Sequence, residues 1–130
     1  MSRPDETSPP GSRRTMNPQD APTRLEPREL GLAPSGLGER ATVVQVSSAF
    51  CAPCRAARTV AARVATTAAG VRHVEVDVAG HEELAAALRI ASTPTVLVLD
   101  ADGVVRERLE GVPRLAWLRE AVERAGAGSA

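Results

Sequence analysis

The sequence predicts an α/β fold in which a mixed β-sheet is flanked by helices. Runs of β-branched residues mark buried strands, and alanine-rich segments with apolar residues at helical spacing mark the helices between them. These segments follow one another in the order β-α-β-α-β-β-α, which is typical of a layered α/β domain. At 130 residues, the chain has room for one small globular domain and a tail.

A β-α-β unit opens the domain. Residues 42–47, Thr-Val-Val-Gln-Val-Ser, form a β-branched run of the length expected for a strand buried on both faces. A helix is expected over 53–69, because this segment is rich in alanine and arginine and is followed by Gly70. Residues 71–78 alternate apolar and polar side chains as a second strand. A right-handed crossover through the helix places the two strands side by side and parallel.

The second half of the domain continues with a short helix that opens at residues 80–83, where two acidic residues suit the N-terminal dipole. Residues 95–99 form a third strand, and the turn at 100–103 leads into a fourth at 104–110, which predicts an antiparallel hairpin. The last helix, over 114–125, has apolar residues at helical spacing and is expected to cover one face of the sheet.

The N-terminal part of the chain has a different composition. Seven of the ten prolines fall in residues 1–40, among serine, glycine, threonine and paired charges. Such a segment cannot bury enough apolar surface to order itself. We therefore expect a flexible extension over 1–40, within which the leucines of residues 24–32 allow a short turn packed on the domain. The domain itself is expected over 41–126, with a flexible tail at 127–130.

Charge and hydropathy restrict the possible partners. All 16 basic residues are arginine and are matched by 16 acidic residues, so no net charge would attract the protein to nucleic acid or to a membrane surface. The first thirty residues contain no apolar stretch, so we expect neither a secretory signal nor a membrane span. The expected state is a cytoplasmic monomer.

Both cysteines of the chain lie in the tetrapeptide Cys51-Ala52-Pro53-Cys54. In a reducing cytosol, one close pair points to redox or metal chemistry rather than to a structural disulfide. The exposed amides and the dipole at the helix start favour a thiolate at Cys51, which is the expected nucleophile. Cys54, one turn inside the helix, is expected to resolve the mixed disulfide that Cys51 forms with a substrate. Pro53 fixes the turn into the helix.

Two other interpretations of the cysteine pair stay open at this point. A buried, reduced pair without turnover would have the same spacing. A zinc site would need four ligands, and beyond the cysteines only His73 and His81 remain, one on a strand and one at a distant helix start. We therefore expect no metal and no bound cofactor, with the dithiol or disulfide of Cys51 and Cys54 as the redox centre.

Five short motifs follow one another between residues 41 and 125. They are Phe50-Cys51-Ala52-Pro53-Cys54, Val76-Asp77, Thr93-Pro94-Thr95, Asp102-Gly103 and Gly111. This series resembles the thioredoxin family. The resemblance implies a thioredoxin-like fold in which the bond before Pro94 is cis and its loop faces the cysteines. It also implies a groove for an extended substrate, formed by Phe50, Ala52, Pro53, Thr93 and Pro94.

The surroundings of the cysteines depart from the family pattern. Phe50 and Ala52 replace the usual tryptophan and glycine, and Ser47 replaces a second tryptophan. Gln45 stands where the family has a buried aspartate that assists proton transfer from the resolving cysteine, and glutamine cannot act as that base. The lysine that partners the aspartate corresponds to His73. We hypothesise that Gln45 and His73 face each other across adjacent strands, and that His73, or water held by Gln45, takes over part of the proton traffic.

The resemblance implies a thiol-disulfide oxidoreductase that reduces protein disulfides and takes part in electron transport and cell redox homeostasis. Its partners would be disulfide-containing proteins and, as electron donor, a thioredoxin reductase. The missing aromatic residues and the missing buried acid keep two alternatives open. One is a binding or adaptor module with little or no redox turnover, and the other is a soft-metal carrier.

Overall fold

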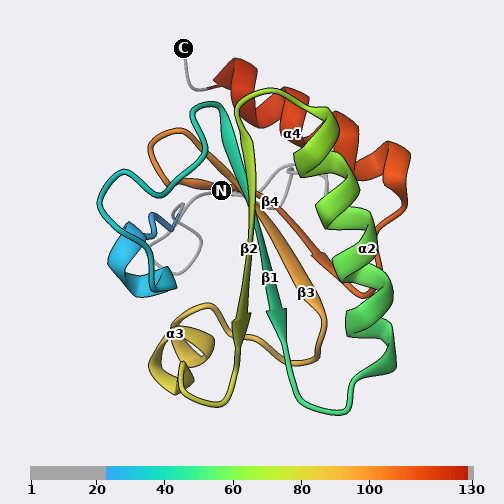
Figure 1. The fold of residues 1–130 in the computed structure, drawn as a ribbon. Helices are drawn as coiled ribbons and strands as arrows, with labels where there is room; N and C mark the ends of the chain where they lie inside the picture. The colour runs from blue at the N-terminus through green and yellow to red at the C-terminus, as the bar shows by residue number, and fades with distance from the viewer. Residues whose placement is uncertain (1–22, 129–130) are drawn as a thin grey trace, which may run out of the picture.

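The computed structural model describes residues 23–128, which form a four-stranded mixed sheet with the strand order β2-β1-β3-β4 (Figure 1). Strand β1 (Ala41–Ser47) pairs in parallel with β2 (Val71–Asp77) and antiparallel with β3 (Thr95–Asp100). Strand β4 (Val105–Glu110) completes the predicted hairpin with β3. The predicted fold class, including the order of strands and helices, is confirmed.

Helices cover both faces of the sheet (Figure 1). Helix α2 (Ala52–Thr67) and helix α4 (Leu115–Gly128) lie on one face, and the short helix α3 (Glu82–Ala87) lies on the other, together with a 3₁₀ turn, η1 (Pro27–Leu30). Because α2 connects the parallel strands β1 and β2, its first residue follows directly from the loop at the carboxyl end of β1. This connection places the cysteine motif just beyond the carboxyl end of a central strand.

The core consists of two apolar layers separated by the sheet. Every residue of the two central strands, β1 and β3, is buried, as the β-branched runs predict. Alternate residues of these strands point to opposite faces, so one cluster forms under α2 and α4 and the other under α3 and η1. The central strands therefore hold the site on a rigid support.

The segment before β1 packs on the sheet from residue 23, whereas the sequence predicts a flexible extension over 1–40. Leu25 and Leu30 are only 3% and 4% exposed and belong to the cluster on the α3 side of the sheet. The N–H of Leu25 also donates to the carbonyl of Gly103 at 2.9 Å. These leucines cover apolar surface that α2 and α4 do not reach, and burial of that surface orders the segment. The expected turn within residues 24–32 is confirmed.

The C-terminal boundary also differs from the expectation. Helix α4 continues to Gly128, so the segment predicted as a flexible tail from residue 127 begins inside the helix. Residues 1–22 of the predicted extension and residues 129–130 of the predicted tail lie outside the described residues. Between residues 23 and 128, no helix has the length and apolar character needed to cross a membrane.

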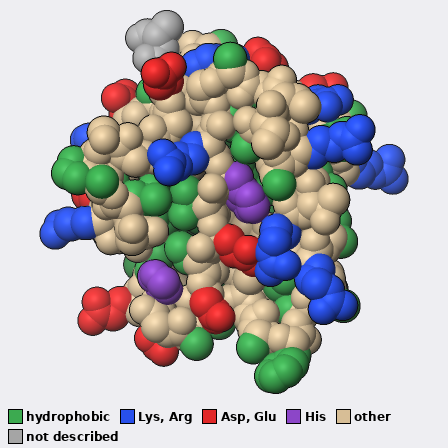
Figure 2. Space-filling view, in the orientation of Figure 1, with side chains coloured by type: hydrophobic (Ala, Val, Ile, Leu, Met, Phe, Trp, Pro, Cys, Tyr) green, Lys and Arg blue, Asp and Glu red, His purple; other side chains and the backbone are tan. Residues whose placement is uncertain are grey.

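Charged side chains of opposite sign concentrate over different helices (Figure 2). On the face shown, arginines gather toward α2, and acidic side chains are frequent near α3. The sequence accounts for this distribution, because α2 carries arginines without any acidic residue and α3 opens with two glutamates. The start of α2 is consequently a locally basic part of a chain whose net charge is zero.

Candidate active site

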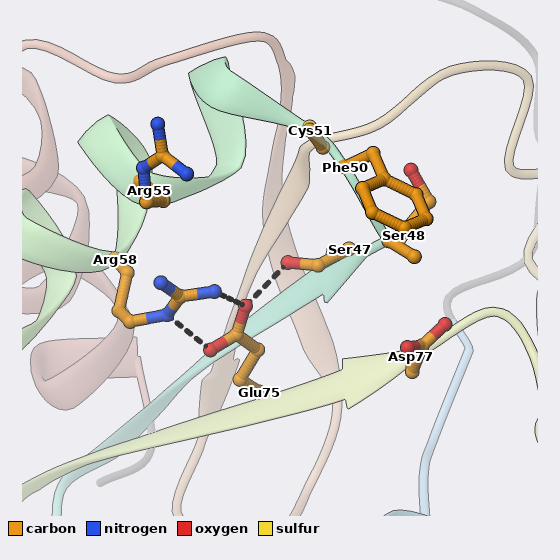
Figure 3. A pocket seen from close by; sticks show the side chains of 9 residues that line it. Ser47, Ser48, Phe50, Cys51, Arg55, Arg58, Glu75 and Asp77 are labelled. Atoms are coloured by element: carbon orange, nitrogen blue, oxygen red, sulfur yellow. Dashed lines mark hydrogen bonds and ion pairs between the residues drawn. The ribbon is translucent and has the colours of Figure 1, made fainter.

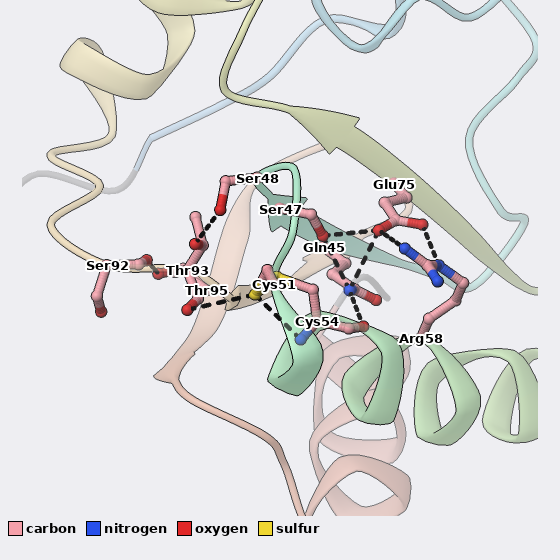
Figure 4. The surroundings of a disulfide bond; sticks show 10 residues. All are labelled: Gln45, Ser47, Ser48, Cys51, Cys54, Arg58, Glu75, Ser92, Thr93 and Thr95. Carbon is pink, nitrogen blue, oxygen red and sulfur yellow. Dashed lines mark hydrogen bonds and ion pairs between the residues drawn. A yellow bond between two sulfur atoms is a disulfide. The ribbon is translucent and has the colours of Figure 1, made fainter.

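Cys51 and Cys54 form a disulfide at the start of α2 (Figure 4). Cys51 is the N-cap residue, and its sulfur accepts a hydrogen bond from the backbone N–H of Cys54 at 3.1 Å. The two cysteines differ in exposure, since Cys51 is partly exposed whereas Cys54 is only 1% exposed. A cysteine sulfur that caps a helix faces the unpaired amides and the positive end of the helix dipole, which stabilise a thiolate.

Pro53 and Arg55 shape the first turn of the helix around this sulfur. Pro53 lies in the first two helical positions, where a missing N–H costs no intrahelical hydrogen bond. The guanidinium of Arg55 makes no ion pair or side-chain hydrogen bond with any of residues 23–128, and it lines the cleft beside Cys51. A cation here adds to the positive potential at the helix start.

The loop before β3 faces the cysteines. Its Thr93–Pro94 peptide bond is cis, as the family resemblance implies. The carbonyl oxygen of Thr93 lies 3.8 Å from the sulfur of Cys51, and the hydroxyl of Thr93 shares a 2.7 Å hydrogen bond with that of Ser48 (Figure 4). Pro94 is buried and Thr93 is partly buried. The backbone of Thr93 is therefore next to the partly exposed sulfur of Cys51.

Phe50 projects from the other side of the cysteine pair into solvent. Its side chain is fully exposed, and its backbone has a positive φ of 56°. A bulky residue in the left-handed region is strained by about 1–3 kcal/mol, and such strain is concentrated at functional sites. Ala52 and Pro53 are also exposed. The five residues predicted to form the groove thus lie around Cys51, three of them exposed and Thr93 and Pro94 packed against the sheet.

An open cleft of about 520 Å³ begins at Cys51 and Phe50 and extends between α2 and the ends of β1 and β2 (Figure 3). Its floor is formed by Ser47 and Glu75, and Arg58 of α2 lies along one side. The lining is mixed, with charged side chains from α2 and β2 on one side and the apolar Ala49 and Phe50 beside Cys51. The exposed cysteine and a cluster of charged side chains therefore share one solvent-filled space.

Gln45 lies beneath the cysteine pair and is completely buried. Its amide nitrogen donates to the carbonyl oxygen of Cys54 at 2.8 Å and to the hydroxyl oxygen of Ser47 at 2.9 Å (Figure 4). A carboxylate oxygen of Glu75 lies 3.4 Å from the same nitrogen. The amide oxygen of Gln45 has no hydrogen-bond partner among the described residues. Gln45 thus binds the backbone of the buried cysteine, Cys54, directly.

Glu75 and Arg58 complete this arrangement, and the sequence did not single out either of them as a site residue. The guanidinium of Arg58 donates to both carboxylate oxygens of Glu75, at 2.6 and 2.8 Å, and the hydroxyl of Ser47 donates at 2.7 Å (Figure 3). The hydrogen bonds from Arg58 lower the pKa of Glu75, against the opposing effect of burial, with a further contribution from Ser47. The same contact raises the pKa of Arg58. Glu75 is thus held as a carboxylate.

His73 does not lie opposite Gln45, so the expected pairing of these two residues is wrong. The register of β1 and β2 places Glu75 opposite Gln45 and His73 opposite Val43. His73 still points to the α2 face, because residues two apart on a strand share a face. Its Nε2 atom is buried and has no partner among the described residues. Burial lowers the pKa of His73, although the nearby carboxylate of Glu75 acts in the opposite direction.

The geometry offers no metal site within residues 23–128, where no three His, Cys, Asp or Glu side chains are grouped to hold an ion. It does offer two sulfur atoms in different environments, an adjacent backbone carbonyl for a substrate segment and a buried hydrogen-bond network behind the second sulfur. These features suit thiol-disulfide exchange, in which one sulfur is reached by the substrate and the other stays shielded.

Comparisons with known proteins agree with this chemistry. The thioredoxin family model matches residues 37–124. A solved thioredoxin of Fasciola hepatica is 30% identical, with a TM-score of 0.59 over 68% of this chain and 83% of that one. Chloroplastic thioredoxin z is 26% identical, with a TM-score of 0.60 over 69% of this chain and 81% of the other.

A mutant thioredoxin of Halobacterium salinarum shares the fold at 20% identity, with a TM-score of 0.62 over 68% of this chain and 76% of the other. No curated protein sequence matches the chain. The family fold, with a disulfide between Cys51 and Cys54, supports thiol-disulfide oxidoreductase chemistry in general. Since the family model covers more than half of the sequence, the chain belongs to the thioredoxin family.

Proposed function

We propose that this protein reduces disulfides of other proteins, with Cys51 as the attacking and Cys54 as the resolving cysteine. The proposal rests mainly on the difference in exposure between the two cysteines of the disulfide. Cys51 is partly exposed at the helix start beside the Thr93 carbonyl, and Cys54 is 1% exposed behind it. Only the first sulfur is accessible to a protein disulfide, and the second is close enough to displace the product.

The reaction runs in two exchange steps. The thiolate of Cys51 attacks one sulfur of the substrate disulfide, forms a mixed disulfide with it and displaces the other substrate sulfur as a thiolate. Cys54 then loses its proton to water and attacks the sulfur of Cys51. The bond between Cys51 and the substrate breaks, and the electron pair leaves with the second substrate thiolate. Two electrons pass from the dithiol to the substrate, and both substrate thiolates take up protons from solvent.

The substrate segment is expected to lie in an extended conformation along Thr93, with Phe50 contacting it from the opposite rim. The partly buried Thr93 backbone provides polar contacts that do not depend on substrate sequence, and the exposed ring provides apolar contact area. We further propose that a thioredoxin reductase returns the disulfide to the dithiol, and that the protein acts as a cytoplasmic monomer. The absence of a bound cofactor is part of the same proposal.

Reduction of insulin disulfides by dithiothreitol tests the function. The wild-type protein should accelerate precipitation of the insulin B chain, and Cys51→Ser should abolish the acceleration because the nucleophile is lost. Cys54→Ser should retain the first step and accumulate a mixed disulfide that is stable in a non-reducing gel. If the wild-type protein and Cys51→Ser give the same rate, the proposed reaction is rejected.

The fully exposed ring of Phe50 favours a second candidate, an adaptor that binds proteins through this rim. Such a module would retain its partner when both cysteines are replaced by serine, and would release it on Phe50→Ala. A reductase shows the opposite dependence, since its complex is covalent and requires Cys51. Capture with the double cysteine variant therefore separates the two candidates.

A further inference from the structure

We propose that Glu75 is a positioning residue for the resolving cysteine, acting through Ser47 and Gln45 on the backbone of Cys54. This inference rests on the proposed function, because it concerns the second of the two exchange steps. Nothing in the sequence pattern marks Glu75, which reads as one polar residue of an alternating strand. Its position opposite Gln45 follows from the register of β1 and β2.

The contacts connect three elements of the fold at one point (Figure 4). Arg58 of α2 donates two charge-assisted hydrogen bonds, at 2.6 and 2.8 Å, to the carboxylate of Glu75 on β2. The side chain of Glu75 keeps 26% of its surface exposed, so holding the charge costs little desolvation. From this fixed carboxylate, the network runs inward to the completely buried Gln45.

The carboxylate sets the direction of every hydrogen bond behind it. Glu75 can only accept, so the hydroxyl of Ser47 points its hydrogen at the carboxylate and offers a lone pair to the amide of Gln45. The amide nitrogen of Gln45 therefore faces three acceptors, the third being the carbonyl of Cys54. This arrangement fixes which end of the amide points at the cysteine.

Removal of the carboxylate would release that orientation. The hydroxyl of Ser47 would then be free to donate toward Gln45, and the amide could turn its oxygen toward the Cys54 carbonyl, where two acceptors repel each other. Because the amide oxygen of Gln45 has no partner among residues 23–128, only the hydrogen bond from its nitrogen to the Cys54 carbonyl would then hold the amide in place. The carbonyl of Cys54 would be anchored less firmly in the first turn of α2.

The two exchange steps depend on this anchor to different degrees. The first attack uses Cys51, which is partly exposed and held by the helix start rather than by Gln45. The second requires the buried sulfur of Cys54 to reach Cys51 at bonding distance, and small misplacements of reacting groups slow a reaction strongly.

Other charges around Glu75 have a smaller part in this step. The charge of Glu75 itself is paired with that of Arg58. Three titratable groups remain nearby: His73 on the same strand, and Asp77 and Arg55 along the cleft. We therefore assign Glu75 a positioning effect rather than a long-range electrostatic one.

Stopped-flow reduction of dithiobis(nitrobenzoate), an aromatic disulfide with a yellow thiolate product, resolves the two steps. The reduced full-length protein releases one yellow thiolate when Cys51 attacks and a second when Cys54 resolves. Glu75→Ala should leave the first phase unchanged and slow the second about tenfold, as expected for loss of a hydrogen bond to a charged group. A far-ultraviolet circular dichroism spectrum equal to that of the wild type shows that the variant is folded.

Three further variants define the origin of the effect. Glu75→Gln should recover part of the second-phase rate, because its amide oxygen still accepts from Ser47. Arg58→Ala should slow the second phase, and adding Glu75→Ala should slow it no further, since both residues act as one unit. The matched control is Glu107→Ala, which removes a similar two-point arginine contact, from Arg124 at 2.9 and 3.3 Å, between α4 and β4. It should change neither phase.

The outcomes separate this inference from the reaction on which it rests. A second phase of wild-type rate in Glu75→Ala, or additive effects of the Arg58 and Glu75 substitutions, would overturn the positioning role. Release of both thiolates by Cys54→Ser would instead overturn the proposed reaction itself. Trapping of the mixed disulfide in Cys54→Ser, together with an unchanged first phase and a slow second phase in Glu75→Ala, would support both.

Discussion

The substitution Gln45→Asp restores the acid that the family resemblance leads one to expect, and we predict that it destabilises this protein. The site is completely buried, and three acceptors face the amide nitrogen of Gln45, including the carboxylate of Glu75 at 3.4 Å. An ionised aspartate would donate to none of them and would be repelled by Glu75. Burial and the like charge both raise the pKa of the introduced carboxyl, so it should stay protonated near neutral pH.

The size of the destabilisation follows from the raised pKa, because the folded protein keeps a proton on the carboxyl that the unfolded chain would release. A carboxyl with a raised pKa in the folded state destabilises increasingly as the pH rises from its unfolded value to its folded value. Each pH unit above an unfolded pKa of about 3.9 costs about 1.36 kcal/mol. The penalty is then about 4 kcal/mol at pH 7 and about 1.5 kcal/mol at pH 5, if the folded pKa lies at or above neutrality.

Urea unfolding of the oxidised protein at the two pH values measures this penalty, with the fluorescence of Trp117, the single tryptophan, as the signal. Trp117 packs against the core cluster under α2 and α4, so its emission should change on unfolding. The control Gln45→Leu removes the same hydrogen bonds without a titratable group, and its cost should not depend on pH. If Gln45→Asp costs the same as Gln45→Leu at both pH values, the reasoning about the buried site is refuted.

Three further predictions concern other parts of the molecule. His73→Ala should change the pH profile of disulfide reduction below the usual histidine range, because burial lowers the pKa of His73, and an unchanged profile would reject its role in proton transfer. Burial opposes ionisation of Asp100, but Arg106 and two backbone N–H groups outweigh it and lower its pKa. The stabilisation by ionised Asp100 is therefore complete at neutral pH and lost as the pH falls through that lowered pKa. Asp100→Asn should accordingly flatten the acid side of the stability profile in urea titrations, and an unaltered slope would contradict this. Leu25→Ala should lower the free energy of unfolding by about 3 kcal/mol, because Leu25 is buried. The control Val112→Ala, at an exposed position, should have little effect on the urea midpoint. Equal midpoints of the two variants would argue against a structural role for the N-terminal segment.

The fold could be predicted from the sequence because its signals are local. The runs at 42–47 and 95–99 are β-branched and uninterrupted, and both form central strands buried on two faces. Right-handed crossover then fixes the parallel pairing of β1 and β2. The positions of the cysteines at a helix start, and of Thr93 opposite them, followed from the same local patterns together with the family resemblance.

The network behind Cys54 could not be predicted in this way, since its members become neighbours only through strand register and helix placement. Glu75 and Arg58 are 17 residues apart, and Arg58 reads as part of the solvated side of its helix. Counting from the first residues of the two strands as predicted, 42 and 71, pairs Gln45 with Val74. The true register begins one residue earlier in β1, and only the structure shows that it places Glu75 beside Gln45. Within residues 23–40 the sequence predicts only the short turn at 24–32. The rest of this segment is predicted as a flexible extension because of its average composition, which does not show that Leu25 and Leu30 complete the core.

A carboxylate near Cys54 has a different effect on stability when it stands on β2, at position 75, than when it stands on β1, at position 45. At position 45 a carboxyl would be fully buried beside Glu75 and would destabilise the protein at neutral pH. At position 75 the carboxylate keeps contact with solvent and is paired with Arg58, so its pKa is lowered and it stays ionised. The uncharged amide of Gln45 then links Ser47 to the carbonyl of Cys54 through hydrogen bonds. Neither Gln45 nor Glu75 is a good proton acceptor at neutral pH, so in the proposed reaction the proton of Cys54 leaves to water, either directly or through His73. The pH profile of His73→Ala tests the second route.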